Sequence, residues 1–422
     1  MAEQAATSPI ISLSFAAGLD NRARETDMPD NAWRTLDNVD VTREGNILVR
    51  QGLRQLLTGA WHSLIQYQGR LIAVKDGELG CYAGGVFTAL VTLSPNSPVR
   101  YAIHNEELYW TTPYQQGRIV GTTATIWGMA LPPLIQATAA SVGGLDAGIY
   151  QVTLTAVHSS GLESGAPEPV VVTVGQGGGI NVTVPTGASF RVYRSTANGG
   201  RDELRLAATL GSGESATLGK ADLGKRLESL FAAKPPSGQA LCSFKGRLWI
   251  ASGSVLQHTS HLSPHWVLPH SYFSFPETIT CLDAAEDGLY VATTGGIWFL
   301  GGNDPAQMTQ RRVSTVGAVP GSPAHELPMD VFSGEGQPAA QQAAWVDSEG
   351  YLCLGKPGGV LLRPHKQRYS MGQHTRAGLA FRQYQGQRQV LVMASSDEET
   401  NPLIAVDGAV SEVAANGFAL NS

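Results

Sequence analysis

The chain has 422 residues, enough for two or three domains or for one large closed β architecture with an insertion. Only 15% of the residues are charged and 49 are glycine, a balance that favours short strands and tight turns over helices. The net charge of −6 argues against a broad basic surface that grips nucleic acid, and no run of about 18 apolar residues predicts a membrane-spanning helix.

The N-terminal region begins with MAEQAATSPIISLSF, which lacks a basic segment followed by a long apolar core, so we expect synthesis in a cytoplasm without a signal peptide. The stretch GLDNRARETDMPDNAWRTLDNVDVTREGNILVRQGL (residues 18–53) follows it. Asp30 is placed to cap a short helical turn that runs to Leu36. Gly45 and Gly52 permit tight reversals around a predicted two-stranded ribbon. The apolar residues of that ribbon are Val39, Val41, Ile47 and Val49.

One pattern then recurs: a polar turn, four or five apolar residues, a second turn and another short apolar strand. Its clear copies lie at 68–85, 105–121, 245–260, 286–302 and 348–364, and a weaker copy runs from 378–396 into 402–410. The first strand of each copy is apolar on both faces, as in LIAV at 71–74, so its sheet must be covered on both sides. Radially stacked small sheets meet this requirement, which predicts a β-propeller of about five to seven blades. An irregular β-sandwich is the alternative, but it does not explain the doubly buried strands.

A different pattern separates the second copy from the third. Apolar and polar residues alternate there, which is typical of a half-exposed antiparallel sheet. One face would carry Tyr150, Val152, Leu154 and Ala156, and the other Gln151, Thr153, Thr155 and Val157. Strands about ten residues apart predict an inserted immunoglobulin-like or fibronectin-like sandwich that ends near the paired prolines of AAKPPSG. A short helix is also expected at 221–233.

The expected domain plan has four parts. Residues 1–60 form the N-terminal short helix and β-ribbon that join the propeller, and 61–131 form the first blades. Residues 132–235 form the inserted sandwich. Residues 236–422 form the remaining blades.

Motifs that carry chemistry are missing or weak. The chain has no common phosphate cradle, serine-nucleophile or zinc-protease pattern. A His-rich segment at 258–270 is the nearest approach to a metal cluster, but Pro264 and the surrounding β pattern predict a polar loop between strands instead. The histidines concerned are His258, His261, His265 and His270.

Other candidate residues also have structural explanations. Acidic segments around Asp283 and Asp347 suggest calcium or a glycosidase carboxylate pair, yet Asp beside Gly is also what hairpin turns require. The aromatic residues inside predicted strands are expected to form blade core rather than a sugar platform: Trp249, Tyr290 and Trp298. The four cysteines lie among apolar neighbours and are expected to be buried free thiols: Cys81, Cys242, Cys281 and Cys353. We therefore predict no catalytic residue, no metal and no cofactor, and not an enzyme.

The opening stretch resembles the N-terminus of bacteriophage tail proteins, namely the tail hub or nozzle of short-tailed phages. Proteins of that class begin with a segment like GGLN, a short helix, NV and a hairpin that ends in R-x-G, and they continue into a β-propeller. This chain reads AAGLDN, where a double glycine followed by Asn is commoner. The residues that carry the resemblance are Gly18, Asn38, Val39, Gly45, Arg50 and Gly52. The inserted segment GIYQVTLTAV also looks like members of this class.

The resemblance implies a structural role in the tail of a virion, reached after synthesis in the host cytoplasm. Similar proteins form a homohexameric ring below the portal and the head-to-tail adaptor ring, retain packaged DNA and conduct it during genome ejection. Expected partners are further copies of the chain, the adaptor, tail fibres and non-specifically passing phage DNA, with no membrane span. Two alternatives stay open: a tail-tip adhesin that binds a host receptor or glycan, and a propeller enzyme that uses the acidic turns.

Overall fold

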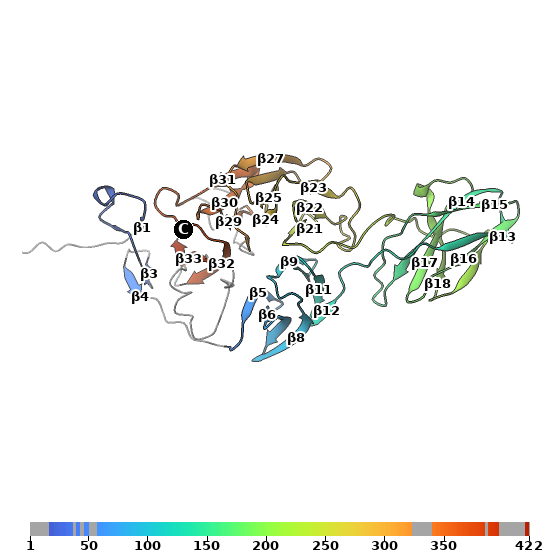
Figure 1. Ribbon diagram of the computed structural model, residues 1–422, viewed down its shortest axis with the longest axis horizontal. Helices are drawn as coiled ribbons and strands as arrows, with labels where there is room; N and C mark the ends of the chain where they lie inside the picture. The colour runs from blue at the N-terminus through green and yellow to red at the C-terminus, as the bar shows by residue number, and fades with distance from the viewer. Residues whose placement is uncertain are drawn as a thin grey trace, which may run out of the picture. The chain divides into compact units, whose positions relative to one another are not determined.

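The computed structural model describes residues 17–36, 39–42, 46–49, 57–322, 340–384, 387–395 and 418–421. Their elements are strands and three short 3-10 turns, η1 (Glu25–Asp27), η2 (Arg201–Glu203) and η3 (Pro357–Gly359) (Figure 1). Among the described residues, no helix is long and apolar enough to span a membrane. The chain divides into two compact units, unit 1 from Met1–Thr92 with Glu277–Ser422 and unit 2 from Leu93–Pro276.

Unit 1 contains two four-stranded antiparallel meanders, the sheet from which propeller blades are made. The first has β5 (Trp61–Tyr67), β6 (Arg70–Lys75), β7 (Glu78–Ala83) and β8 (Val86–Thr92). The second has β24 (Ile279–Ala285), β25 (Gly288–Thr293), β26 (Ile297–Gly301) and β27 (Thr309–Ser314). Successive residues Ile72, Ala73 and Val74 of β6 are all 0% exposed, although they point to opposite faces of the sheet. The predicted covering of both faces is therefore confirmed.

Two further sheets complete the C-terminal part of unit 1. One has three strands, β29 (Ala343–Val346), β30 (Leu352–Lys356) and β31 (Val360–Leu362). The other pairs β28 (Gly321–Ser322), β32 (Arg376–Tyr384), β33 (Gln387–Ser395) and β34 (Phe418–Asn421) in that order. A shared apolar core joins the two sheets, with Val346 and Leu354 from one and Val390 and Val392 from the other.

The N-terminal segment contains β1 (Gly18–Leu19), β2 (Ala32–Trp33), β3 (Val39–Val41) and β4 (Ile47–Val49). The predicted ribbon is confirmed, because β3 and β4 pair antiparallel. The helical turn predicted from Asp30 is wrong, because β2 occupies that place and pairs parallel with β1. The reversal comes earlier, where the Asp20 carboxylate accepts hydrogen bonds from the backbone N–H groups of Arg22 (3.1 Å) and Ala23 (2.8 Å).

Unit 2 contains two more meanders of the blade type. One has β9 (Arg100–His104), β10 (Glu107–Thr111), β11 (Gln116–Val120) and β12 (Thr123–Thr125). The other has β20 (Ala240–Phe244), β21 (Arg247–Ser252), β22 (Val255–His258) and β23 (Tyr272–Ser274). The protein thus has the predicted all-β fold of propeller blades, while the number of blades in a ring stays a prediction.

An immunoglobulin-like sandwich is inserted between these two meanders. One sheet has β13 (Gln136–Leu145), β16 (Gly178–Thr183) and β19 (Ser215–Leu218). The other has β15 (Val170–Val174), β14 (Gly148–Val157), β17 (Ser189–Arg194) and β18 (Arg205–Leu210). The alternate residues Tyr150, Val152, Leu154 and Ala156 of β14 all join the core between the sheets, as the sequence predicts.

The other face of β14 was predicted to be half exposed, and this is wrong for Thr153 and Thr155, which are 0% exposed. Residues 158–168, the strap, fold back over them, and Thr153 Oγ1 donates a hydrogen bond to Pro167 O at 2.9 Å. The strap packs closely on the return linker: a Cβ at Gly165 would lie 1.7 Å from Ala232 O. Only glycine permits this approach.

The helix predicted at 221–233 is also wrong. The segment contains no helix, and most of its backbone hydrogen bonds go to neighbouring segments. Leu206 N donates to Lys225 O at 2.9 Å, and Leu227 N donates to Leu204 O at 2.9 Å. With Ala166 and Tyr193, Leu204 and Leu227 form a second apolar cluster. These tertiary contacts outweigh the local helix propensity of the segment.

Candidate functional site

The structure describes only part of the opening motif. Gly18 lies in β1 with φ 70°, a left-handed conformation that favours glycine, and Val39 pairs with Val49 in the ribbon. The remaining motif residues lie outside the described residues: Asn38, Gly45, Arg50 and Gly52.

The GLDN sequence of the motif docks on the C-terminal loop, residues 363–375, which joins β31 to β32. Asn21 makes three hydrogen bonds there. Its backbone N donates to Arg368 O at 2.9 Å, and its side chain exchanges hydrogen bonds with Ser370, from Nδ2 to Ser370 O (2.8 Å) and from Ser370 N to Oδ1 (3.1 Å). We call these contacts the anchor. In the described residues the ribbon strands β3 and β4 pair only with each other.

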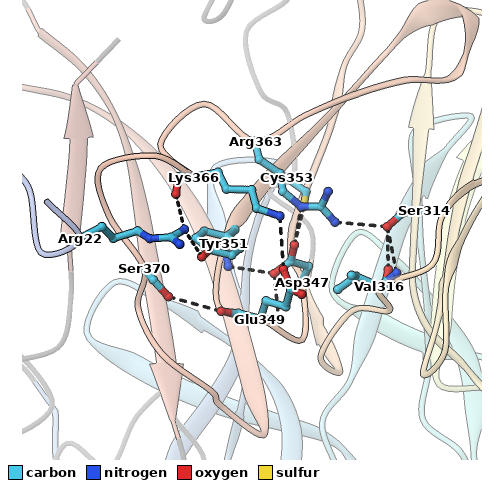
Figure 2. Close-up of polar contacts among 10 residues, drawn as sticks. All are labelled: Arg22, Ser314, Val316, Asp347, Glu349, Tyr351, Cys353, Arg363, Lys366 and Ser370. Carbon is cyan, nitrogen blue, oxygen red and sulfur yellow. Dashed lines mark hydrogen bonds and ion pairs between the residues drawn. The ribbon is translucent and has the colours of Figure 1, made fainter.

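Arg22 extends the anchor (Figure 2). Its Nη1 donates to Lys366 O at 2.5 Å and to the Tyr351 hydroxyl. The guanidinium carbon lies 5.5 Å from the centroid of the Tyr351 ring, and Lys366 Nζ lies 5.3 Å from the same centroid. Both cations therefore stand within cation–π distance of one buried ring.

Asp347 organises the structure beneath the anchor. Its side chain is 0% exposed, and Oδ1 accepts hydrogen bonds from the backbone N–H groups of Glu349 (3.1 Å) and Tyr351 (2.9 Å). Its Oδ2 accepts one from Arg363 Nε at 2.6 Å and one from Cys353 Sγ at 3.5 Å. Figure 2 shows these donors converging on the carboxylate. Asp347 thus holds its own turn, as predicted for an acidic hairpin residue.

Arg363 connects the C-terminal loop with a strand of the preceding meander. Its Nη2 donates to Ser314 Oγ of β27 at 3.2 Å, and Ser314 Oγ lies 3.1 Å from Val316 O (Figure 2). Burial raises the pKa of the Cys353 thiol well above its usual value, so this thiol stays protonated and donates to Asp347. These contacts stabilise the structure and leave Asp347 no open coordination position.

The second acidic candidate, Asp283, lies inside β24 opposite Tyr290, and not in the hairpin turn predicted for it. The turn falls at 286–287. Burial raises the pKa of Asp283 to about 7, although part of the residue reaches solvent. Its Oδ1 accepts a hydrogen bond from Ala284 N (2.9 Å) and its Oδ2 one from Ala344 N (3.0 Å). Both oxygens thus bind backbone, one of them on a neighbouring sheet.

The His-rich segment 258–270 connects β22 to β23, which is the loop between strands that the sequence predicts. Among the described residues, no group of three or more His, Cys, Asp or Glu is arranged to hold a metal. His258 is buried, with its ring centroid 4.9 Å from that of Trp249, whereas His261 and His270 are exposed.

The same segment holds both linkers of the inserted sandwich. On the outgoing linker, Trp127 Nε1 donates to Pro264 O at 2.7 Å. On the return linker, Ala233 and Val267 exchange two backbone hydrogen bonds of 2.9 Å each. We call residues 127–128, 233–235 and 258–270 the mount. Nothing in the sequence pattern indicated this role, because the three acceptors Pro264 O, Ala233 O and Val267 O are backbone carbonyls of apolar residues.

A third contact joins the mount to the strap of the sandwich. Trp266 Nε1 donates to Glu163 O at 2.9 Å. Between Trp266 and Pro264 lies His265, and burial together with the nearby Arg118 charge lowers the pKa of His265 to about 4. His265 is therefore neutral at pH 7 and adds no charge to the mount.

Gly128→Ala should separate the outgoing linker from the other segments of the mount. Gly128 has φ 76°, and a Cβ there would lie 2.7 Å from Pro235 Cδ and 2.8 Å from His265 O. Overpacking of this kind costs about 1–3 kcal/mol, so we expect chymotrypsin to cleave after the buried Trp127 about tenfold faster. Gly121→Ala is the matched control, because Gly121 has φ 60° with nothing within 4 Å. Equal cleavage rates in the two variants would show that backbone strain, and not the clash, opens the linker.

The remaining candidates have structural roles. Trp249 and Tyr290 are 1% exposed and belong to the blade core as predicted, while Trp298 is partly exposed with Arg312 5.7 Å from its ring centroid. The prediction of buried free thiols is confirmed for all four cysteines: Cys81, Cys242, Cys281 and Cys353.

No family model matches the chain, and no curated protein sequence does. Solved structures similar to it include BBS1N in complex with ARL6DN, with 12% identity, 80% of this chain and 89% of that chain covered, and a TM-score of 0.32. The WD40 β-propeller domain of Doa1 has 10% identity, coverage of 81% and 95%, and a TM-score of 0.27. PorZ of Porphyromonas gingivalis has 10% identity, coverage of 86% and 54%, and a TM-score of 0.24. None of these three is a phage tail protein, and similarity this low indicates no function for this chain.

Proposed function

We propose that the chain is a virion structural protein that forms the nozzle or hub ring of a phage tail, retains packaged DNA and conducts it during ejection. The anchor is the observation that carries the proposal. The GLDN sequence lies in the stretch that resembles tail nozzles, although a double glycine followed by Asn is commoner there, and in this chain Asn21 binds the backbone of Arg368 and Ser370, about 350 residues further along the chain. The motif thus has a structural use that joins the two ends of unit 1, which suits a ring component.

The state of the acidic residues supports a role without catalysis. Asp347 is bound by two backbone N–H groups and by Arg363, and Asp283 by two backbone N–H groups. Asp347 is therefore a poor general base or nucleophile, because proton transfer first requires that its hydrogen bonds break. The inserted sandwich, held through the mount, is the part proposed to carry tail fibres.

Native mass spectrometry tests the proposal on the full chain, alone and mixed with the adaptor protein of the same phage. A discrete ring of six copies in either sample is the expected result. A matched sample of Asn21→Ala tests the anchor, and we expect it to weaken ring formation because both side-chain hydrogen bonds with Ser370 in the C-terminal loop are lost. A chain that stays monomeric or trimeric with the adaptor present would refute the ring.

A tail-tip adhesin is the second candidate, and exposed apolar side chains on the sandwich favour it. Val142 is 76% exposed, Val171 63% and Ile149 49%, and the last two lie on adjacent strands. Apolar side chains that remain in water often mark a binding surface. Binding of the full chain to host cells, lost in Val171→Ser with ring formation unaltered, would support the adhesin.

A further inference from the structure

The C-terminal loop lies in a part of the sequence with an unusual charge balance. The chain has 35 acidic residues against 29 Lys and Arg, yet from 350 to 396 it contains no Asp or Glu. The positive residues of that stretch are Lys356, Arg363, Lys366, Arg368, Arg376, Arg382 and Arg388. Although the chain is mildly acidic overall, the stretch from 350 to 396 is therefore positively charged.

Two neighbouring hollows open on this loop. The first, of about 510 Å³, is lined by Arg22, Ala23, Lys366 and Gln367. The second, of about 480 Å³, is lined by Leu361, Arg363, Pro364, Lys366, Gln367 and Arg368. They share Lys366 and Gln367, both exposed, and no acidic side chain among the described residues lines either hollow. The hollows thus offer two adjacent places for negative groups.

Four cations line the hollows, and among the described residues Arg22 and Arg368 have no carboxylate at ion-pair distance. Arg363 is paired with the buried Asp347, and Lys366 with Glu349. Arg22 binds the Tyr351 hydroxyl and a backbone carbonyl, and Arg368 Nη1 binds Ala17 O at 3.2 Å. Since these acceptors are neutral, the charges of Arg22 and Arg368 remain available.

Two carboxylates lie close enough to reduce the local charge. Glu349 Oε2 is 3.5 Å from Lys366 Nζ, but both side chains are 46% exposed, so this ion pair is weak. Backbone N–H groups lower the pKa of Asp20, and the charges of Arg368 and Arg34 lower it further. The two negative side chains, Asp20 and Glu349, are outnumbered by four positive ones, so the net charge around the hollows is positive. The positive side chains are Arg22, Arg34, Lys366 and Arg368.

We propose that the two hollows bind consecutive phosphate groups of a nucleic acid backbone. Arg, Lys and Gln side chains are typical phosphate donors, and two hollows that share Lys366 suit a polymer with repeated phosphates better than a single anion. Base recognition is not expected, because the Tyr351 ring is only 9% exposed beneath Arg22 and Lys366 and is not available for stacking. The choice of DNA as the polymer rests on the proposed function.

Fluorescence anisotropy of a labelled DNA duplex of arbitrary sequence, titrated with the full chain at several salt concentrations, tests the proposal. With about three charges in contact, the logarithm of the binding constant should fall with the logarithm of salt with a slope of about −2.7. Lys366→Ala with Arg368→Ala should reduce the slope by about two and weaken binding at least tenfold at low salt. Arg201→Ala with Lys220→Ala removes two exposed charges from the sandwich and should leave both values nearly unchanged.

Four results would overturn the inference. The first two are no DNA binding at low salt and an equal loss of DNA affinity in the two double variants. The third is complete displacement of DNA by inorganic phosphate at equal phosphate concentration. The fourth is binding to vesicles of anionic phospholipid but not to DNA. Ring formation is measured without DNA, so the two proposals fail separately. A ring that does not bind DNA refutes only the phosphate site. A monomer that binds DNA with the expected salt dependence refutes only the ring.

Discussion

Asp347→Ala should lower the free energy of unfolding of unit 1 by about 3–5 kcal/mol, the range for removal of one partner from a buried ion pair. The change leaves Arg363 without its carboxylate in a site where its side chain is only 18% exposed. It also removes the acceptor of the Glu349 and Tyr351 backbone N–H groups and of the Cys353 thiol. The turn beneath the anchor then loses the residue that organises it.

Hydrogen-exchange mass spectrometry in a urea series measures this loss locally, in peptides from β30 of unit 1, with β14 of unit 2 as internal reference. Glu349→Ala is the control, because it lies in the same turn and loses only the exposed pair with Lys366. We expect it to change stability by less than about 0.5 kcal/mol. If the two variants lose the same protection in β30, the buried pair does not stabilise this unit.

The blades were predictable because their signal is local. LIAV at 71–74 is apolar on both faces, and only a sheet covered on both sides accommodates such a strand. The alternation from Tyr150 to Val157 likewise located β14 and its inward face. Its outward face was predicted wrongly, since nothing in the alternation reveals that the strap returns to cover Thr153 and Thr155.

The anchor and the mount depend on partners that are distant in the sequence or that have no sequence signature. Asn21 binds Ser370 across 349 residues. Trp127 and Trp266 donate to backbone carbonyls of Pro264 and Glu163, and every residue has such a carbonyl. Sequence periodicity therefore predicts which strands form and which side chains enter the core, but not which loop receives which donor.

Glu163→Gln should destabilise the sandwich at pH 7 and make its stability less dependent on pH. Glu163 accepts hydrogen bonds from Thr155 Oγ1 and Tyr193 OH, each at 2.6 Å, and pairs with Arg191 and with Lys225. Burial by itself would raise the pKa of Glu163, but the two hydroxyls and two cations outweigh it, and the pKa falls below its usual value. Hydrogen bonds to a charged group contribute about 1.5–3 kcal/mol, and we expect a loss of that size at pH 7.

The direction of the pH dependence follows from the lowered pKa. Below pH about 4.5 the unfolded chain takes up a proton at Glu163 before the folded chain does, so the stabilisation present at neutral pH is lost as the pH falls through the folded pKa. The difference in free energy of unfolding between the original chain and Glu163→Gln should therefore become smaller from pH 7 to pH 3. Hydrogen exchange of β14 and β17 in urea measures this difference. Glu168→Gln is the control, because its pair with Arg201 is about half exposed. If this difference in stability stays constant over the pH range, the strap is held by its backbone contacts and by Trp266, and not by the charge of Glu163.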